Sequence, residues 1–433
     1  MKSYSVDLDQ MMEAREKRAA TQNRMLEGAG PEQCLVCLTM NIAGDVKRTP
    51  MICMLFEHGM KQLESLNFSI RESLVLNEKT GCEAFWLLDE EGARVKAMLE
   101  RVEDSFPAAR LYDFDVILPG GSKLSRAEGR RCLICDAYAA ECARSRRHGL
   151  DEVKRATDEL LKDFCAAELA QAAHASLLDE LYTTPKPGLV DMNNNGAHPD
   201  MDVSLFEKSA DALAPYFKDA ATLGMEFCRI SSLRERGIKA EEEMFAATGG
   251  VNTHKGLIYS MGLLLAGMGR SLTEGGSCVK HAADLASEDA EEQLKKTLAA
   301  PVTNGGAVYK IYGAKGATGE AAAGFPDAQY CLGRLTFYRE NNCNDPAVLA
   351  LCDSMAVLED TNLLHRGGME GLEYVRREAG RISGLPENER IDEMRRLDRE
   401  LIKLSLSPGG SADMLALAFL LERWQAMSND LFY

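Results

Sequence analysis

The sequence predicts a multidomain protein, with an N-terminal α+β (or α/β) domain over residues 1–160 and an all-α helical domain over residues 161–433. The chain has 433 residues, too many for one ordinary domain, and 45% of them are apolar, enough for sizeable cores. Strand and helix patterns alternate up to about Ser125, and helical patterns alone follow it. We therefore place the domain boundary in a long charged helical run, near residue 160.

The N-terminal elements are amphipathic helices that alternate with apolar, β-rich runs. In the first helix Leu8, Met11 and Met12 recur at helical spacing, and Gly44-Asp45 ends the first strand-like run. The expected helices are 8–26, 50–66, 90–101, 132–142 and 151–181, and the expected strands are 34–44, 83–88 and 110–118. After Tyr182 the helices are separated by polar, glycine-rich loops.

Composition excludes several classes of partner and compartment. The formal charge of −17 argues against nucleic acid as the main partner, because a phosphate backbone needs a basic surface. The first 20 residues are charged and lack the apolar core of a signal peptide, and no apolar run is long enough to span a membrane. With 13 Cys, an odd number, we expect a cytoplasmic protein with reduced thiols and no membrane association.

Two aspartates on the last N-terminal strand form a candidate metal site. Asp113 and Asp115 are two residues apart, so on a strand both carboxylates point to the same face. Convergent carboxylates suit a Mg²⁺ ion that carries a nucleotide phosphate. The alternative is an ordinary solvent-facing side of the strand, with Phe114 and Val116 on the buried side.

Two Cys-x-x-Cys pairs raise the question of zinc. Cys34 and Cys37 lie on a predicted strand, where a spacing of three points them to opposite faces. Cys132 and Cys135 lie in a predicted helix, and Cys142 and His148 could complete a site with them. We expect buried, reduced cysteines that pack as small apolar groups, and we do not expect zinc.

The same segment is rich in arginine although the protein is acidic. These guanidinium groups are suited to phosphates or to an acidic partner protein, and the alternative is a solvated helix face. The candidates for phosphate or carrier contacts are Arg126, Arg131, Arg144 and Arg146, with Arg130 and Arg147 in the same run.

A stiff loop over residues 184–202 carries the first C-terminal candidates. Pro185 and Pro187 at its start exclude helix interior, and they lead into a polar stretch with acidic side chains and a histidine. Asp191, His198 and Asp200 crowd this loop, which suits Mg²⁺–phosphate contacts and acid–base chemistry. The alternative is a mobile acidic loop without a ligand.

The next candidate is a glycine pair followed by a polar cluster and an apolar helix. Gly249 and Gly250 precede Asn252, His254 and Lys255, which stand where that helix begins. The unpaired N–H groups of a helix start bind anions, so we expect a phosphate site here. An Asn-capped buried helix is the alternative. Further on, a glycine-rich segment around Lys315 has the composition of a flexible lid.

Two more segments repeat this arrangement. Asp360, Asn362 and Arg366 precede a Gly-Gly pair at 367–368, and Asn362 and Arg366 share a helix face at a spacing of four. A third pair, Gly409 and Gly410, precedes Ser411, a predicted N-cap, and Asp413 in the first helical turn. Three such pairs in one helical domain suggest that several helix ends converge on one polyanionic ligand.

These motifs resemble two known families. TPKPGLVDMNNNGAHPDMD, GGVNTHKG, EDTNLLHRGG and SPGGSADMLA, in this order from about residue 165 to 433, resemble triphosphoribosyl-dephospho-CoA synthase. CLTMNIAG, YDFDVILPGG and RRCLICDAYAAECARSRRH resemble apo-citrate lyase phosphoribosyl-dephospho-CoA transferase, so the chain looks like a fusion of the two. Ala43 stands where the transferase family has Pro, and Thr318 stands where the synthase family often has Arg, which leaves the shape of both loops in doubt.

The resemblance implies a bifunctional transferase. The synthase part would join ATP and 3′-dephospho-CoA and release adenine, with Lys255 and Arg366 on the triphosphate. Mg²⁺ would be bound by Asp191, Asp200 or Asp360, and His198 or His254 would donate a proton. The transferase part would attach the product to a serine of the apo-acyl-carrier subunit of citrate lyase and release pyrophosphate.

Two rival functions remain open at this point. An all-α, Mg²⁺-dependent ADP-ribosyl hydrolase also uses Asp-rich loops, but it needs no CoA acceptor. A non-enzymatic adaptor for the carrier protein could instead be stabilised by zinc on the Cys132–His148 segment.

Overall fold

The structure is a computed structural model that describes residues 5–126, 128–288, 304–429 and 431. The chain divides into two compact units. The N-terminal unit comprises Met1–Cys165 with Ser428–Tyr433, and the C-terminal unit comprises Ala166–Met427. The division falls inside the helix α5 (Leu150–Tyr182), which runs without a break through the change of unit.

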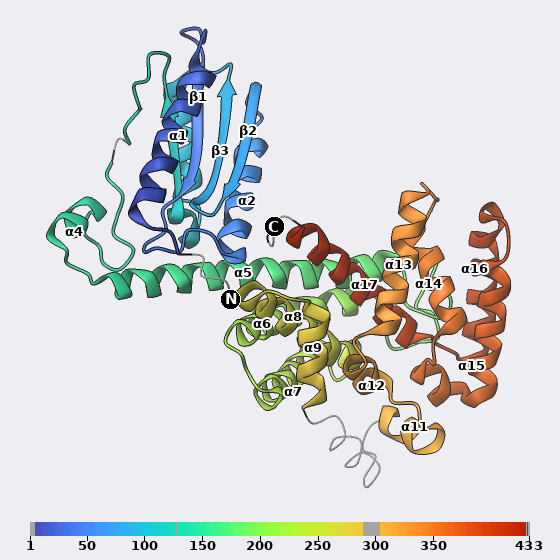
Figure 1. The fold of residues 1–433 in the computed structure, drawn as a ribbon. Coiled ribbons are helices and arrows are strands. Elements are labelled where there is room, and N and C mark those ends of the chain that lie inside the picture. The colour runs from blue at the N-terminus through green and yellow to red at the C-terminus, as the bar shows by residue number, and fades with distance from the viewer. Residues whose placement is uncertain (1–4, 127, 289–303, 430, 432–433) are drawn as a thin grey trace. The chain divides into compact units, whose positions relative to one another are not determined.

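The N-terminal unit is built on one antiparallel sheet, so its fold is α+β. Its strands are β1 (Cys34–Met40), β2 (Ile70–Glu78), β3 (Gly81–Leu88) and β4 (Tyr112–Ile117), in the order β2-β3-β1-β4 (Figure 1). β2 was not expected from the sequence. It is an edge strand with most side chains exposed, so its charged residues hide the apolar alternation that marks a half-buried strand.

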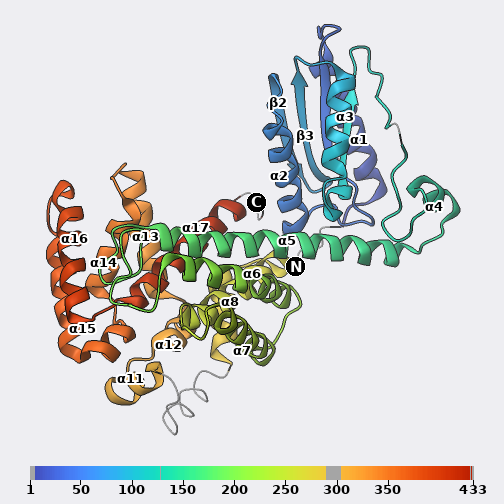
Figure 2. The same cartoon turned by 180° about the vertical axis from the view of Figure 1, so that it is seen from behind.

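Helices cover both faces of this sheet. α1 (Leu8–Leu26) lies on one face, where Met25 packs with Leu35, Cys37 and Phe85. α2 (Pro50–Ser65) and α3 (Gly92–Glu103) lie on the other face (Figure 2). The predicted opposite orientation of Cys34 and Cys37 is confirmed, because Cys37 belongs to the α1 cluster whereas Cys34 approaches Gly92 of α3.

The predicted helix over residues 132–142 is wrong. Only α4 (Ala139–Ser145) is helical, and residues 131–138 form a loop closed by a β-bridge between Arg131 and Tyr138. The 3-10 helix η1 (Pro107–Leu111) leads into β4. In the loop of residues 131–138 a turn determines the positions of Cys132 and Cys135. Their spacing of three residues therefore does not place them on one face of a helix.

The C-terminal unit is helical in all its described elements. They are α6 (Val203–Met225), α7 (Ile230–Ala247), α8 (Lys255–Glu274), α9 (Cys278–Ser287), α11 (Asn304–Tyr312), α12 (Gly316–Ala322), α13 (Pro326–Glu340), α14 (Pro346–Val357), α15 (Thr361–Ser383), α16 (Glu387–Leu404) and α17 (Gly409–Ser428). α8 is its central helix, with most side chains buried. No helix in the described ranges is long and apolar enough to cross a membrane.

Close packing against α8 depends on glycine. A Cβ at Gly224 of α6 would stand 2.0 Å from the carbonyl oxygen of Ala266, and one at Gly269 would stand 2.2 Å from that of Ala221. α6 and α8 therefore approach with their backbones nearly in contact. This packing holds the start of α8 in a fixed position beside the loops that precede α12, α15 and α17.

Candidate active site

A cavity of about 1260 Å³ lies within the C-terminal unit. Its wall includes the starts of α8, α12, α15 and α17, together with the end of α5 and the loop before α6. The sequence-predicted residues that line it are His198, Asn252, His254, Lys255, Lys315, Asp360, Asn362, Arg366, Gly409, Gly410 and Asp413. The cavity thus brings together residues from five separate segments of the chain.

Several helix starts do meet at the cavity, but two of the three predicted glycine pairs are not located at these helix starts. Gly249 and Gly250 follow the end of α7 with φ of 64° and 91°, and neither lines the cavity. The amide of Gly250 bonds the carbonyl of Phe245, as in a helix C-terminus. Gly367–Gly368 lies at a kink inside α15, where Gly368 has φ of 62°.

Gly409 and Gly410 open α17 and allow α15 to approach it. A Cβ at Gly409 would stand 2.5 Å from Nδ2 of Asn362, and one at Gly410 would stand 3.1 Å from the carboxylate of Asp360. Asp360 is the N-cap of α15, and its Oδ1 accepts from the amides of Asn362 and Leu363. Its Oδ2 accepts from the amide of Ser411 at 2.9 Å, so one buried carboxylate joins two helix starts.

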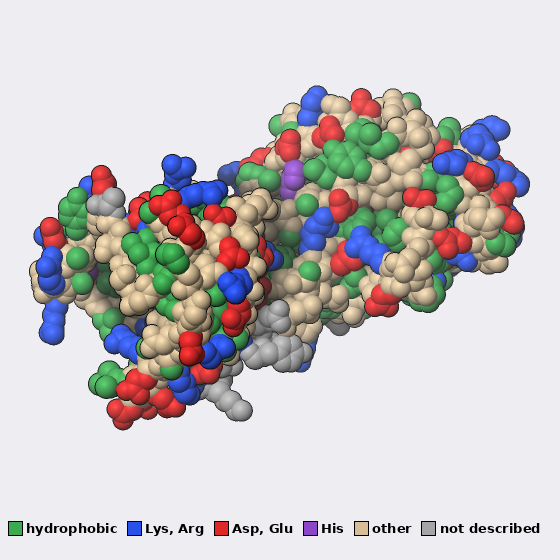
Figure 3. All heavy atoms as spheres, turned by 90° about the horizontal axis from the view of Figure 1, so that it is seen from above, with side chains coloured by type: hydrophobic (Ala, Val, Ile, Leu, Met, Phe, Trp, Pro, Cys, Tyr) green, Lys and Arg blue, Asp and Glu red, His purple; other side chains and the backbone are tan. Residues whose placement is uncertain are grey.

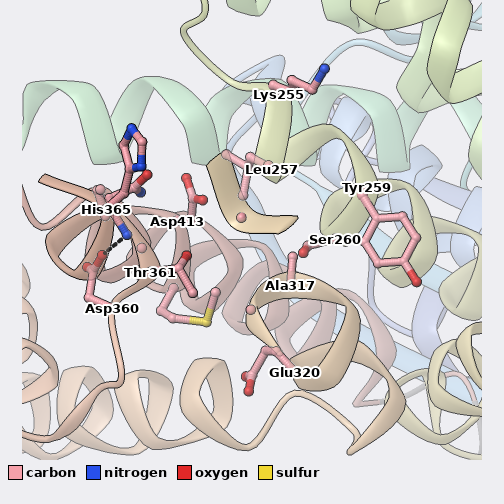
Figure 4. A pocket seen from close by; sticks show the side chains of 18 of the residues that line it. Lys255, Leu257, Tyr259, Ser260, Ala317, Glu320, Asp360, Thr361, His365 and Asp413 are labelled. Carbon is pink, nitrogen blue, oxygen red and sulfur yellow. Dashed lines mark hydrogen bonds between the residues drawn. The ribbon is translucent and has the colours of Figure 1, made fainter. Parts of the chain in front are cut away.

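A second carboxylate faces the cavity beside Asp360. Asp413 has no hydrogen bond or ion pair to any other residue that the structure describes, and its Oδ2 lies 3.3 Å from where a Cβ of Gly256 would stand. Burial raises its pKa well above the ordinary value, and the charges of Asp360 and Glu180 raise it further. Burial also raises the pKa of Asp360. Figure 4 shows these two aspartates on one side of the cavity.

Asp191 and Asp200 do not line the cavity. Asp191 is buried, and its oxygens accept from the amides of Lys186, Asn193 and Asn194, so this carboxylate organises the turn. Asp200 is exposed. The expected roles of Asp191 and Asp200 as catalytic residues and Mg²⁺ ligands therefore receive no support from their positions, because neither carboxylate reaches the wall that Asp360 and Asp413 share.

The cationic side chains of the cavity differ in whether they already form ion pairs or hydrogen bonds within the protein. Lys255 forms an ion pair with Glu241 and points away from Asp360 and Asp413 (Figure 4). Arg366 donates from Nη1 to the carbonyl of Ala197 at 3.1 Å. Lys315, the N-cap residue of α12, is exposed and has no polar partner among the described residues.

Three histidines line the cavity, namely His198, His254 and His365. His198 and His254, the two predicted proton donors, are held in the neutral form. His198 is half-buried beside Arg366, and burial, followed by the charge of Arg366, lowers its pKa to about 4. His254 is buried with Nδ1 2.6 Å from Oγ of Ser209, and burial lowers its pKa to about 3. A neutral imidazole is a poor proton donor, so neither matches the expected role of acid.

The acidic groups of the cavity that sequence reasoning did not single out include Glu180 and Glu320. Glu320 on α12 accepts from the amides of Asp327 and Ala328, and burial raises its pKa to about 7. Glu180 bonds the fully buried ammonium of Lys186. Each is a single carboxylate on a helix without a flanking motif, so only the folded chain reveals it.

In the N-terminal unit the two predicted metal ligands face cations. Asp115 forms an ion pair of 2.5 Å with Lys123, and Asp113 lies 3.3 Å from Arg130. Both alternate with the buried Phe114, as expected for one face of β4. Neither carboxylate belongs to a group of three or more possible metal ligands in the described part of the chain.

The arginine run does not form one helix face. Arg126 pairs with the buried Glu103 at 2.9 Å and with Asp104 at 2.5 Å. Arg131 stacks on Tyr138, with the guanidinium carbon 4.5 Å from the ring centroid. Arg144 and Arg146 are exposed near the end of α4. Arg126 is thus occupied inside the unit, whereas Arg144 and Arg146 are available to a partner.

The loop before and after α4 gathers three cysteines and a histidine. One ligand atom from each of Cys132, Cys135, Cys142 and His148 lies within 4.8 Å of the others. The expectation against zinc rested on the opposite orientation of Cys34 and Cys37 and on cysteines that pack as buried apolar groups, but Cys132 and Cys135 are only partly buried. On the face drawn in Figure 3, basic and acidic side chains are interspersed.

Comparison with known proteins gives two family matches in sequence order. Residues 6–164 match the model of CitX, apo-citrate lyase phosphoribosyl-dephospho-CoA transferase. Residues 166–430 match that of CitG, ATP:dephospho-CoA triphosphoribosyl transferase.

Individual relatives include single-domain and fused proteins. Protein CitXG of Haemophilus influenzae is 32% identical over 95% of both chains. The 2-(5''-triphosphoribosyl)-3'-dephosphocoenzyme-A synthase of Haemophilus ducreyi is 36% identical over 66% of this chain and 97% of its own. A crystal structure of a putative triphosphoribosyl-dephospho-coA synthase from Archaeoglobus fulgidus covers 51% of this chain and 99% of its own, with 15% identity and a TM-score of 0.36.

Proposed function

Because this chain belongs to the CitX and CitG families, joined in one polypeptide as in the CitXG proteins, we propose that it catalyses two successive transfers. It is a transferase of citrate lyase prosthetic-group synthesis. In our proposal the C-terminal unit makes 2'-(5''-triphosphoribosyl)-3'-dephospho-CoA from ATP and 3'-dephospho-CoA. The N-terminal unit then attaches it to a serine of the apo-acyl-carrier subunit, in the cytoplasm.

The first transfer exchanges one bond at the ATP ribose. The 2'-hydroxyl oxygen of dephospho-CoA forms a bond to C1' of that ribose, and the bond from C1' to N9 of adenine breaks. The hydroxyl proton goes to a base, adenine leaves with the bonding electrons and takes up a proton, and the triphosphate is retained. The site must therefore hold a polyanion while the reaction proceeds at the other end of the same molecule.

The observation that carries this proposal is the cavity where four helix starts meet. The positive ends of the helix dipoles favour a phosphate chain, even though Asp360 already accepts from the first amides of α15 and α17. The ammonium of Lys315 has no polar partner among the described residues, so we assign it the closest contact with the triphosphate, supported by Asn252, Lys255, Asn362 and Arg366. Because Lys255 is paired with Glu241, it acts through charge at longer range.

Asp360 and Asp413 are the residues that would hold a Mg²⁺ ion in this cavity. The fit rests on Asp413, a carboxylate without a hydrogen-bond or ion-pair partner among the described residues, whose pKa is raised by burial and by the charge of Asp360. Two repelling carboxylates offer the hard oxygen ligands that this ion requires. When bound there with ATP, Mg²⁺ would neutralise charge on the triphosphate.

We assign proton acceptance to Glu320. Its pKa of about 7 lets a substantial fraction be ionised at neutral pH while it remains basic enough to take the proton of the attacking hydroxyl. The two amides that bond Glu320 hold its carboxylate on the cavity wall. His198 and His254 then serve to position their neighbours and not to donate protons.

The second transfer is assigned to the edge of the N-terminal sheet. The serine oxygen of the carrier would attack the phosphorus atom that is joined to the ribose. The bond from this phosphorus to the next phosphate would break, and pyrophosphate would leave. Asp113 and Asp115 would accept a Mg²⁺ ion that arrives with the triphosphate, releasing Arg130 and Lys123 to the phosphates. The exposed Arg144 and Arg146 would meet an acidic carrier.

Adenine release tests the first transfer. The full chain should release adenine from ATP and Mg²⁺ only when 3'-dephospho-CoA is present. Free adenine released without dephospho-CoA would mean that water replaces the acceptor, adenine-containing products such as ADP-ribose would indicate an ADP-ribosyl hydrolase, and no release at all would refute the synthase assignment. Supplying preformed triphosphoribosyl-dephospho-CoA with apo-carrier tests the second transfer separately, by the mass gained on the carrier serine and the pyrophosphate formed.

A further inference from the structure

Four metal-ligand side chains meet in the N-terminal unit without any part in the proposed reactions. Sγ of Cys135 lies 3.5 Å from Sγ of Cys142 and 3.3 Å from Nε2 of His148. Sγ of Cys132 completes the group within 4.8 Å. It is the one cluster of three or more possible metal ligands found among the described residues.

We propose that Cys132, Cys135, Cys142 and His148 bind one structural zinc ion. A tetrahedral zinc with Zn–S bonds of about 2.3 Å places its sulfur ligands ~3.8 Å apart, close to the separations here. Three cysteines and one histidine are a common set for a closed structural site. Binding releases the thiol protons, because the thiolate is the ligand.

The loop geometry brings the four ligands together. The amide of Cys132 bonds the carbonyl of Ala137, and the amide of Ala139 bonds the carbonyl of Arg130, which closes the turn that carries Cys135. α4 then presents Cys142, and the chain reverses after it to return His148. Arg110 donates to the carbonyls of Arg131 and Cys132, which anchors this turn next to η1.

The surroundings of the ligands match a zinc site as well. Nδ1 of His148 lies 3.5 Å from Oε1 of Glu152, so a carboxylate faces the ring nitrogen that does not reach the cysteines. Such a partner fixes the orientation of a metal-bound imidazole. Arg147 approaches Sγ of Cys135 at 3.9 Å, and its charge offsets the net negative charge of three thiolates around Zn²⁺.

The segment also buries little apolar surface of its own. Between Leu118 and Ala156, Cys142 is the only buried residue that the structure describes. A stretch with so little apolar burial needs a covalent or metal crosslink to stay ordered. Zinc would thereby fix the loop that holds Arg130 beside Asp113, where the second transfer is proposed.

Metal analysis of the untagged full chain tests this inference. Protein from zinc-supplemented cells should contain about one equivalent of zinc per chain. Cys132→Ser and Cys142→Ser should each lose it, whereas Cys343→Ser, a half-buried cysteine of the C-terminal unit, should keep it. Co²⁺ added to the stripped protein should give thiolate charge-transfer absorption and the strong visible bands of tetrahedral cobalt.

Three results would overturn the proposal. These are wild-type protein without zinc and without a cobalt spectrum, zinc that persists in the Cys132→Ser/Cys142→Ser double variant, and a Cys135–Cys142 disulfide in protein prepared without oxidant. Because the wild-type measurements need no variant to fold, misfolding of a cysteine variant does not remove the test. Adenine release by the C-terminal unit should be the same in all these proteins.

Discussion

Arg366 donates a hydrogen bond from Nη2 to Nδ1 of His198 at 3.1 Å, and this bond determines which ring nitrogen carries the proton. A guanidinium only donates, so Nδ1 accepts and Nε2–H donates to Oγ of Ser407 at 2.8 Å. The loop before α6, the first turns of α15 and the segment before α17 are joined through one imidazole. His198 is therefore a positioning residue in our assignment.

Replacement of Arg366 should change the titration of His198. In Arg366→Met the pKa of His198 should rise from about 4, because the nearby positive charge is lost and the site becomes more open. The measurement is NMR titration of the ring protons. Arg377→Met, an exposed residue of the same helix, is the control and should leave the titration unchanged. An unaltered curve in Arg366→Met would show that burial alone sets this pKa.

Substitution of Asp413 should lower activity with little change in stability, whereas substitution of Asp360 should lower stability. Asp413→Asn should lower adenine release about 10²–10³-fold and raise the Mg²⁺ concentration required, with little change in melting temperature, since no hydrogen bond of the described residues is lost. Asp360→Asn places an NH₂ group against amides that now donate to the carboxylate. It should cost about 1–3 kcal/mol of unfolding free energy.

The two aspartate variants are compared by turnover and thermal unfolding measured on the same protein samples. Equal loss of stability in both would mean that Asp413 is also a structural capping residue. Full activity in Asp413→Asn would exclude it as a metal ligand.

Glu320 should give the synthase reaction its pH dependence. The base must be ionised, so kcat/KM for adenine release should rise with pH and level off above about 7. Glu320→Gln should lower the rate about 10²–10⁴-fold and remove that rise. The pH–rate profile at saturating dephospho-CoA is the measurement. A rise retained in Glu320→Gln would assign the titration to another group.

Lys315 and Lys255 should not be equivalent. Lys315→Ala should raise the KM for ATP about tenfold, which corresponds to the loss of roughly 1.4 kcal/mol from one charged contact. Lys255→Ala should have a smaller effect, because its ammonium already pairs with Glu241. Lys310→Ala, an exposed lysine outside the cavity, is the control. In all three variants the second transfer should remain intact with preformed product, and its loss would contradict the division of labour between the units.

A sequence pattern predicts a local feature well when it is typical of only one kind of structure. The continuous apolar run around Phe85 and the apolar alternation around Phe114 identify β3 and β4, and the spacing of Asn362 and Arg366 places them on one helix. A glycine pair is ambiguous, because positive φ ends a helix as readily as it opens a loop. Gly249 and Gly250 therefore belong to the end of α7 and not to the anion site.

Other features depend on contacts that local pattern does not encode. Asp191 has the chemistry of a ligand, but its oxygens stabilise the turn before α6 and its side chain does not line the cavity. Glu320 has an ordinary sequence context, and only burial raises its pKa. The sequence identifies Cys132, Cys135, Cys142 and His148 as a possible ligand set, but the geometry that brings them together comes from a turn and a reversal of the chain, which the expected helix did not include.

His254 should make the C-terminal unit sensitive to acid. Its pKa is lowered to about 3 in the folded state by burial, whereas in the unfolded chain it is about 6.5. The unfolded chain therefore binds the extra proton first, and unfolding free energy is lost as pH falls from about 6.5 towards 3. At about 1.4 kcal/mol per pKa unit, the loss over this range is on the order of several kcal/mol.

Trp424 allows the acid sensitivity to be measured in the C-terminal unit. The chain has two tryptophans, so Trp86→Phe leaves Trp424 of α17 as the single indole. Denaturant unfolding followed by its fluorescence should show a midpoint that falls between pH 7 and pH 5. His254→Asn should start from a lower midpoint, because the bond to Ser209 is altered, but with a shallower pH slope. An equal slope in both proteins would mean that other groups, His198 among them, carry the acid sensitivity.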